Sequence, residues 1–278
     1  MQVRAPAKIN LNLRVLGRRA DTGFHDIETW MAPVTLADDL RVDLSDTPGI
    51  QLTCSDSALN AGSSNLAWRA ADLFLRVTAH PGGATIELRK HIPHGAGLGG
   101  GSSDAAAVLN ALNTLAKHPL SADELETLGA QLGSDVPFFI RGIAAMAKGR
   151  GEILTPAPLA HPLDLLLLKP PFTVETAWAY REWSAGNSCP AAWTAPQLAD
   201  GIEVFNDLET PVFAKHLILP AMKMWLLEHS LVSAAGMSGS GSCMFAILRD
   251  ARGADALAAE AKAEFGMTLW TAACRTGP

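Results

Sequence analysis

The chain has 278 residues and a mass of 29.3 kDa, which is enough for one large domain or two of ordinary size. Because 48% of the residues are hydrophobic and 18% are charged, the composition excludes a mainly disordered chain. The 22 Lys and Arg residues against 28 Asp and Glu residues give a net charge of −6, which leaves no basic stripe for a nucleic-acid backbone. We therefore expect a compact protein without a nucleic-acid partner.

We expect neither a membrane anchor nor a secretion signal in this sequence. Its longest strongly apolar run, residues 163–168, is far shorter than the roughly 20 residues that cross a bilayer. The four cysteines are far apart and lack metal-ligand spacing, which favours reduced thiols over a zinc site. We expect a cytoplasmic protein with no membrane partner; the oligomeric state is left open.

Alternating apolar residues predict strands over 9–15, 40–44 and 85–89. A helix is predicted over 65–77, with Ser63 or Ser64 as its N-cap. A second helix is predicted over 102–117, and a third opens at Ser121, where the S-x-x-E capping box ends in Glu124, and stops near Gly133. The first half of the chain should therefore combine a sheet with helices.

Prolines at 156 and 158 interrupt regular structure, and residues 163–169 then predict a new buried strand. We place the domain boundary there, giving an N-terminal domain over 1–156 and a C-terminal domain over 157–278. In the second domain we expect a loop over 184–201, a helix over 220–230, a strand over 243–248 and a helix over 253–264.

The most informative segment is the glycine-rich stretch 93–103, in which five of the seven residues 95–101 are glycine. Glycines let the backbone approach a ligand, and free amides at the start of a helix favour an anion. A flexible linker is the alternative, but a linker has no need to run into a capped amphipathic helix. The acidic residue expected about 20 residues after a dinucleotide-binding loop would fall at Asp123 or Glu124, inside the capping box, so that match is accidental. The segment also lacks the lysine of a Walker loop. We predict phosphate binding, with any cation supplied from elsewhere.

Two separate residues could complete such a site. Lys8 begins an apolar strand, where lysine is unfavourable unless it has a partner or reaches solvent. Asp135 lies in a turn between a helix and an apolar segment. Taken singly, Lys8 would more often be a surface lysine, and Asp135 would more often be a helix-capping aspartate. Only their combination with the glycine-rich segment favours catalysis.

In order and spacing, four segments resemble the GHMP kinases over nearly the whole chain: Pro-Ala-Lys-Ile-Asn at 6–10, the glycine-rich segment, Gly-Ser-Asp-Val-Pro at 133–137 and Gly-Ser-Gly at 239–241. Residues 17–29 are similar to the G-x-R-x-D-G-Y-H-x-L-x-T signature of the 4-diphosphocytidyl-2-C-methyl-D-erythritol kinase family, as are 149–154 and 205–209. The resemblance implies a two-domain α+β fold, with an N-terminal ribosomal-protein-S5-like domain and a C-terminal ferredoxin-like α/β sandwich domain.

That resemblance also implies an activity: ATP-dependent phosphorylation of the 2-hydroxyl of a small-molecule substrate, the cytidine diphosphate methylerythritol, in the non-mevalonate isoprenoid pathway. By motif, Asp135 would accept the hydroxyl proton and Lys8 would be the cation beside it. ATP would be bound by Asn65, Lys90, Pro93, His94, Gly95, Ala96, Gly97, Leu98, Gly99, Gly100, Gly101, Ser102 and Ser103. A hydroxyl of Ser103 or Ser102 would touch Mg²⁺.

The acceptor would contact Asn10, Phe24, His25 and Tyr180. Two departures from the family pattern occur here: Phe24 replaces the usual Tyr, and Thr22 is an inserted residue. A phenylalanine ring still stacks on a base but loses the hydrogen bond of a phenol. Burial of Phe24 in the core and a purely structural role for His25 remain open alternatives.

Two other functions stay open from the sequence. Another GHMP small-molecule kinase is opposed by the Phe24-His25 segment, and a catalytically idle nucleotide-binding protein is opposed by the presence of both Lys8 and Asp135. The sequence contains neither H-E-x-x-H nor a G-x-S-x-G elbow, so metalloprotease and α/β-hydrolase chemistry are not supported.

Overall fold

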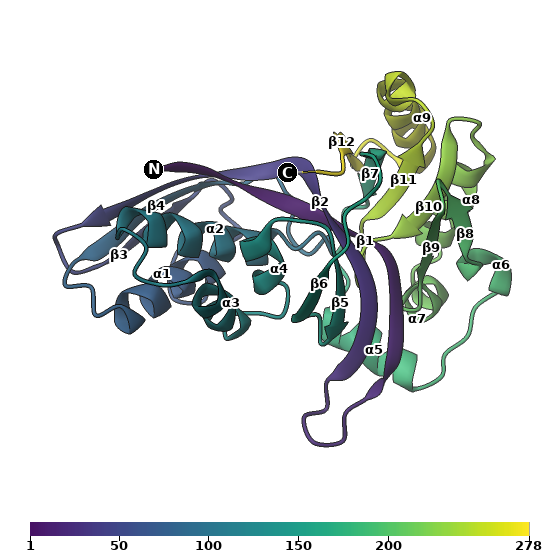
Figure 1. Ribbon diagram of the computed structural model, residues 1–278. Coiled ribbons are helices and arrows are strands. Elements are labelled where there is room, and N and C mark those ends of the chain that lie inside the picture. The colour runs from purple at the N-terminus through teal and green to yellow at the C-terminus, as the bar shows by residue number, and fades with distance from the viewer. Residues whose placement is uncertain (278) are drawn as a thin grey trace.

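A computed structural model describes residues 1–277 and builds them around two sheets (Figure 1). In chain order, the first half contains β1 (Gln2–Arg18), β2 (His25–Ser45), β3 (Gly49–Cys54), α1 (Leu66–Val77), β4 (Gly83–Arg89), α2 (Gly100–Leu115), α3 (Ala122–Ala130), α4 (Val136–Arg141), β5 (Ala145–Gly149) and β6 (Ile153–Pro156). The second half contains β7 (Asp164–Lys169), α5 (Thr176–Ser184), α6 (Ala191–Thr194), β8 (Gln197–Ala199), β9 (Ile202–Asn206), α7 (Glu209–Lys215), α8 (Ile218–Glu228), β10 (Val232–Met237), β11 (Met244–Leu248), the short 3-10 helix η1 (Ala251–Gly253), α9 (Ala254–Phe265) and β12 (Trp270–Arg275).

The first sheet has eight strands in the order β3-β4-β2-β1-β9-β8, with β5 and β6 added beside β2. Strands β1 and β2 pair antiparallel along most of their length, and their connecting hairpin projects below the rest of the molecule in Figure 1. Period-two alternation decides which residues of β1 face the core. Ile9 and Leu11 are fully buried toward the second sheet, which places Lys8 and Asn10 on the opposite face.

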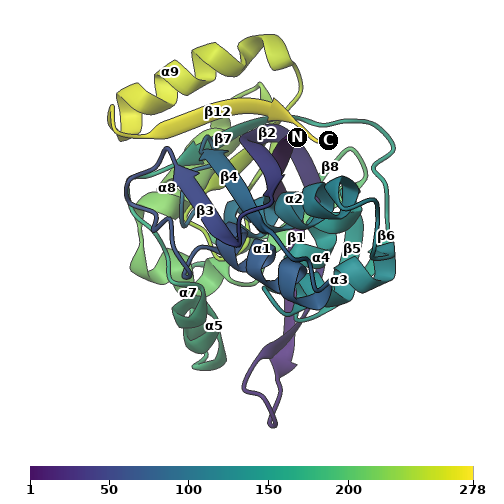
Figure 2. The same ribbon diagram turned by 90° about the vertical axis from the view of Figure 1, so that its left-hand side faces the viewer.

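The second sheet is antiparallel, with the order β12-β7-β11-β10. This is the strand order of a ferredoxin-like domain, in which the first strand lies between the third and the fourth. Both faces of β7 are buried: Leu166 and Leu168 pack under the helices, whereas Leu165 and Leu167 face β1 of the first sheet. Burial on both sides explains the continuous run of leucines. Figure 2 shows α9 lying along the outside of this sheet beside β12.

Most predicted elements are confirmed, including the helix at 65–77, the capping box of Ser121 and Glu124, and the buried strand at 163–169. The predicted cap of α1 is wrong: Asn65, rather than Ser63 or Ser64, accepts the Ala67 amide. The expected loop over 184–201 is also wrong in part, because it contains α6 and β8, and helix α7 was not foreseen.

The expected division into 1–156 and 157–278 stays a prediction. Strands β8 and β9 come from the second half of the chain but hydrogen-bond into the first sheet, where β9 pairs in parallel with β1. The two sheets also share a core in which residues of β1, β7 and β11 pack together. Within residues 1–277, no helix is long and apolar enough to cross a membrane.

A buried ion pair in the second half gives a test of the packing. Lys223 Nζ lies 2.6 Å from Glu209 Oε2, and the two side chains are 1% and 0% exposed. Lys223→Met should cost about 3–5 kcal/mol of unfolding free energy, because it leaves a buried carboxylate unpaired. The double variant Glu209→Gln/Lys223→Met should recover most of that loss, as measured by urea denaturation. Equal destabilisation in the single and double variants would contradict this account.

Candidate active site

A cavity of about 1350 Å³ opens between the glycine-rich loop, β1, β2, α5 and the turn at 239–240. The structure brings nearly all the site residues expected from the sequence to this one space. Its lining includes Lys8, Asn10, Phe24, His25, Asn65, Lys90, Pro93, His94, Gly95, Ala96, Gly97, Leu98, Gly99, Gly100, Gly101, Ser102, Asp135 and Tyr180. The exception is Ser103, whose side chain is buried away from the cavity.

The glycine-rich loop connects β4 to α2 through three left-handed residues, Gly95, Gly97 and Gly99, with φ of +62°, +75° and +72°. Close packing also requires glycine here: a Cβ atom at Gly97 would lie 2.1 Å from the Ser238 carbonyl oxygen. The loop ends at the N-terminus of the 16-residue helix α2. Its unpaired amides and the helix dipole therefore face the cavity as an anion-binding surface.

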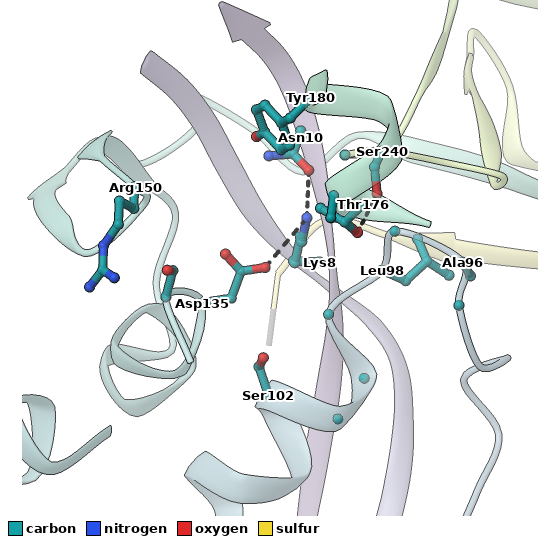
Figure 3. A pocket seen from close by; sticks show the side chains of 18 of the residues that line it. Lys8, Asn10, Ala96, Leu98, Ser102, Asp135, Arg150, Thr176, Tyr180 and Ser240 are labelled. Carbon is teal, nitrogen blue, oxygen red and sulfur yellow. Dashed lines mark hydrogen bonds and ion pairs between the residues drawn. The ribbon is translucent and has the colours of Figure 1, made fainter. Parts of the chain in front are cut away.

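Lys8 is the buried cation of the site, with only 4% of the residue exposed. Its Nζ donates to Asn10 Oδ1 at 2.5 Å and lies 3.8 Å from Asp135 Oδ2 (Figure 3). Burial lowers the pKa of Lys8, and the negative charge of Asp135 opposes that shift. The alternative of a surface lysine is therefore wrong.

Asp135 precedes α4 at the N-cap position, yet its side chain makes no capping hydrogen bond. The alternative of a helix-capping aspartate is therefore wrong as well. Its carboxylate points toward Lys8 in Figure 3 and keeps 33% of its side chain exposed. A carboxylate that is both exposed to the cavity and next to a buried ammonium group can accept a proton from a bound ligand.

Asn10 links Lys8 to its surroundings. Its Nδ2 donates to Thr29 Oγ1 at 2.8 Å, and its backbone amide donates to Ser238 Oγ at 3.4 Å. Beside Lys8, the hydroxyls of Ser240 and Thr176 are 2.8 Å apart (Figure 3). These contacts join β1, β2, α5 and the turn at 238–240 around the Lys8 ammonium group.

The predicted nucleotide contact Lys90 is held by two buried carboxylates. Its Nζ donates to Asp38 and, at 2.6 Å, to Asp104 Oδ2. Burial raises the pKa of Asp104 to about 7, although Lys90 favours its charged form. Asp38 also accepts the backbone amides of His91 and Ile92, just before the glycine-rich loop. Lys90 thus lines the cavity while it joins the two ends of that loop.

The serine hydroxyls at the start of α2 differ in accessibility. Ser102 lines the cavity, whereas Ser103 is 1% exposed and its Oγ has no hydrogen-bond partner within residues 1–277. Neighbouring residues on a helix point about 100° apart, so only one of the two can face the ligand. Within the described part of the chain, no three His, Cys, Asp or Glu side chains cluster as metal ligands.

The other end of the cavity is aromatic and cationic. Phe24 is 54% exposed, which excludes the alternative of burial in the core, and the Arg150 guanidinium lies 5.0 Å from its ring centroid. His25 stacks on Tyr180 at 5.1 Å between ring centroids and pairs through Nε2 with Ser184 Oγ at 2.6 Å. Burial and the charge of Arg18 lower the pKa of His25, so the neutral ring is favoured.

Sequence reasoning missed several residues that line this cavity, among them Arg150, Thr176 and Ser240. Arg150 occupies the variable position of a Gly-x-Gly motif, and Ser240 lies within the Gly-Ser-Gly turn, so both motifs were seen without these side chains. Thr176 carries no sequence signal, because only the fold brings α5 to the turn.

Comparison with known proteins agrees with this geometry. Residues 65–143 match the family model of the GHMP kinases N terminal domain, and residues 194–266 match that of the GHMP kinases C terminal domain. The chain is 43% identical over 271 residues to the 4-diphosphocytidyl-2-C-methyl-D-erythritol kinase of Methylacidiphilum infernorum, covering 96% of this chain and 93% of that protein. It is 39% identical to the kinase of the same name from Geobacter metallireducens, covering 91% and 92% of the two chains.

Solved structures give the same result. A crystal structure of 4-(cytidine 5'-diphospho)-2C-methyl-D-erythritol kinase is 36% identical and superposes with a TM-score of 0.82 over 100% of both chains. Homoserine kinase from Cytophaga hutchinsonii, at 17% identity and a TM-score of 0.68 over 99% and 94% of the chains, shares the fold. These matches confirm the expected two-domain α+β GHMP kinase fold. The chain therefore belongs to the 4-diphosphocytidyl-2-C-methyl-D-erythritol kinase family of ATP-dependent GHMP kinases.

Proposed function

We propose that this protein transfers the γ-phosphoryl group of ATP to the 2-hydroxyl of 4-diphosphocytidyl-2-C-methyl-D-erythritol, releasing ADP and the 2-phosphate. One observation carries the proposal. The buried Lys8 ammonium group lies 3.8 Å from the Asp135 carboxylate in a cavity that has a phosphate-binding loop and an aromatic end. A catalytically idle nucleotide-binding protein would have no need for a buried lysine beside an aspartate that does not cap its helix.

The nucleotide binds along the glycine-rich loop. The amides of this loop and the dipole of α2 stabilise the phosphates, and Asn65 and Lys90 border the adenosine end. The loop is fixed at both ends, because Asp38 accepts amides before it and Lys90 pairs with Asp104 after it. A fixed loop places the phosphates without a further loss of backbone entropy on binding.

Transfer itself depends on position and charge. In phosphoryl transfer the hydroxyl proton leaves late and negative charge spreads over the phosphoryl oxygens. Asp135 accepts the proton of the 2-hydroxyl, and Lys8 stabilises the charge that develops on the transferring group. Asn10 holds the Lys8 ammonium group in place, since its own amide is fixed by Thr29.

Mg²⁺ would reach this site with the phosphates of the nucleotide, where the cavity offers the Ser102 hydroxyl beside the glycine-rich loop. A hydroxyl oxygen and phosphate oxygens are suitable hard ligands for it. We assign the protein ligand to Ser102, which lines the cavity, in place of Ser103, whose hydroxyl is buried. When bound, Mg²⁺ would neutralise charge on the phosphates.

The aromatic end binds the cytidine. Phe24 and Tyr180 offer ring faces to the base. Because burial lowers the pKa of His25 and favours its neutral ring, His25 offers one donor or one acceptor to the edge of the base. Arg150 covers the Phe24 ring and supplies a positive charge near the diphosphate of the acceptor. We propose that the reaction serves isoprenoid precursor synthesis in the cytoplasm, where the four free cysteines would stay reduced.

Product identification tests the proposal directly. The purified protein with ATP, Mg²⁺ and the cytidine diphosphate methylerythritol should form ADP and one new phosphate ester in equal amounts. Phosphorus NMR should assign that ester to the 2-position. ADP release without an ester, or an ester at another hydroxyl, would contradict the proposed reaction.

Asp135→Asn tests the proton acceptor. The amide keeps the shape of the side chain but cannot accept a proton, so kcat should fall by about 100-fold or more. The dissociation constant of ATP, measured by calorimetry, should not change. Asp255→Asn, an exposed change on α9, is the matched control and should keep full activity. Near wild-type turnover of Asp135→Asn would exclude the assigned role.

Lys8 predicts a pH dependence. Burial lowers its pKa below the ordinary value of 10.5, so Lys8 loses its proton at a lower pH than an exposed lysine. Turnover should therefore fall on the alkaline side, with a midpoint below that value. In Lys8→Arg, kcat should be lower but the alkaline decline should vanish, because a guanidinium group stays charged. A decline that persists in the arginine variant would assign it to another group.

Phe24→Ala tests base stacking. Loss of one stacking face is worth about 1–3 kcal/mol, which corresponds to a KM for the acceptor roughly 5–150 times higher. The KM for ATP should not change. Leu16→Ala removes a side chain of similar exposure, 58%, from the same hairpin but outside the cavity lining, and serves as the control. An unchanged acceptor KM in Phe24→Ala would rule out stacking.

A further inference from the structure

Segment 205–209, with the sequence Phe-Asn-Asp-Leu-Glu, has no role in the site described above. Within residues 1–277, none of its members lines the cavity. Its polar side chains are nevertheless deeply buried, with Asn206 at 3% and Glu209 at 0% exposure. Buried polar groups are costly unless their hydrogen bonds are made, so the partners of these residues indicate what the segment does.

We propose that Asn206, supported by Glu209, is a positioning residue that fixes the turn 237–241 against Lys8 and so sets the rate of phosphoryl transfer. Asn206 ends β9, and its Nδ2 donates to the carbonyl oxygens of Met237 and Gly239, both at 2.7 Å. Its Oδ1 accepts the Leu208 amide at 2.9 Å. Both amide protons of this side chain are therefore used to hold the start of the turn.

Glu209 holds the same point from the other side. Its Oε1 accepts the Met237 amide at 2.9 Å, and its Oε2 pairs with Lys223. The amide and the carbonyl oxygen of Met237 are thus bound by two buried side chains of one segment. Such a doubly held residue cannot shift without leaving a buried polar group unpaired.

The turn fixed in this way forms a wall of the reaction site. A Cβ atom at Gly239 would lie 3.3 Å from Lys8 Nζ and 3.3 Å from Asn10 Oδ1, so the backbone of the turn packs directly on both groups. Ser238 Oγ donates to the Gly97 carbonyl oxygen at 3.0 Å and accepts the Asn10 amide. A displacement of the turn would therefore reach both the buried lysine and the phosphate-binding loop.

The segment is also anchored to the strand that carries Lys8. Strand β9 pairs in parallel with β1, the Asp207 amide donates to the Leu13 carbonyl oxygen, and Asp207 Oδ2 accepts the Val15 amide at 2.8 Å. One segment thus connects β1 to the turn and determines the spacing between them. Since an error of about 1 Å at a reacting centre can cost about 100-fold in rate, this spacing affects turnover more than nucleotide binding.

The test compares two isosteric changes. Asn206→Asp removes both donors to the turn. Gln197→Glu is the matched control, because Gln197 also binds one residue of β10 twice, donating to the Ala235 carbonyl oxygen at 2.8 Å and accepting its amide at 3.0 Å, but lies away from the turn. Asn206→Asp should lower kcat by about tenfold or more with an unchanged KM for ATP, whereas Gln197→Glu should keep kcat.

Hydrogen exchange provides a second readout that does not depend on activity. The amides of 238–241 should exchange faster in Asn206→Asp and at the wild-type rate in Gln197→Glu. Equal kcat losses in both variants, faster exchange without a loss of kcat, or unchanged exchange would each overturn the inference. If Asn206→Asp does not fold, Ser238→Ala removes the hydrogen bonds that join the same turn to Gly97 and Asn10 and should also lower kcat; unchanged turnover in that variant would overturn the inference.

The inference rests on the proposed phosphoryl transfer, and the two can fail separately. If the wild-type protein phosphorylates no acceptor, the proposed function fails. The exchange rates then decide alone whether Asn206 fixes the turn.

Discussion

The arrangement of this protein depends on keeping one lysine charged inside the molecule. Lys8 is 4% exposed, and burial favours loss of its proton, so the surrounding groups must offset the lost hydration. Asn10 and Asp135 do so from two sides, without neutralising the lysine through a short ion pair. A cation held in this way, at low effective dielectric, stabilises a developing negative charge far more than an exposed lysine would.

The fold meets this requirement by bringing distant segments to one point. The β1 strand supplies Lys8 on the face opposite its apolar residues. Asp135 immediately precedes α4, and its side chain does not cap that helix. The glycine-rich loop and the turn 237–241 pack around these two residues so closely that no residue larger than glycine fits at Gly97. The two sheets share one core, and this core holds the elements at fixed positions relative to one another because a close-packed interior has low compressibility.

Much of the candidate site could be predicted from the sequence. The glycine-rich segment and a lysine at the start of an apolar strand are locally unusual, and Asp135 gained meaning only in combination with them. The ion-pair partners of the site residues could not be predicted from the sequence. The ion pairs of Lys90 with Asp38 and Asp104 depend on contacts between elements far apart in the chain.

Other details depended on tertiary structure in the same way. The return of β8 and β9 to the first sheet and the role of Asn65 as a helix cap were not visible in the sequence. The sequence could not show which of Ser102 and Ser103 lines the cavity, because that depends on the rotation of α2 about its axis, which periodicity leaves uncertain by a residue or two.

The most direct test of the central claim measures ADP release by the purified protein with ATP, Mg²⁺ and one acceptor at a time. The acceptors are the cytidine diphosphate methylerythritol, homoserine, mevalonate and galactose, with a blank lacking acceptor. The account predicts release with the first acceptor alone; release with another acceptor, or ATP binding without any release, would contradict it.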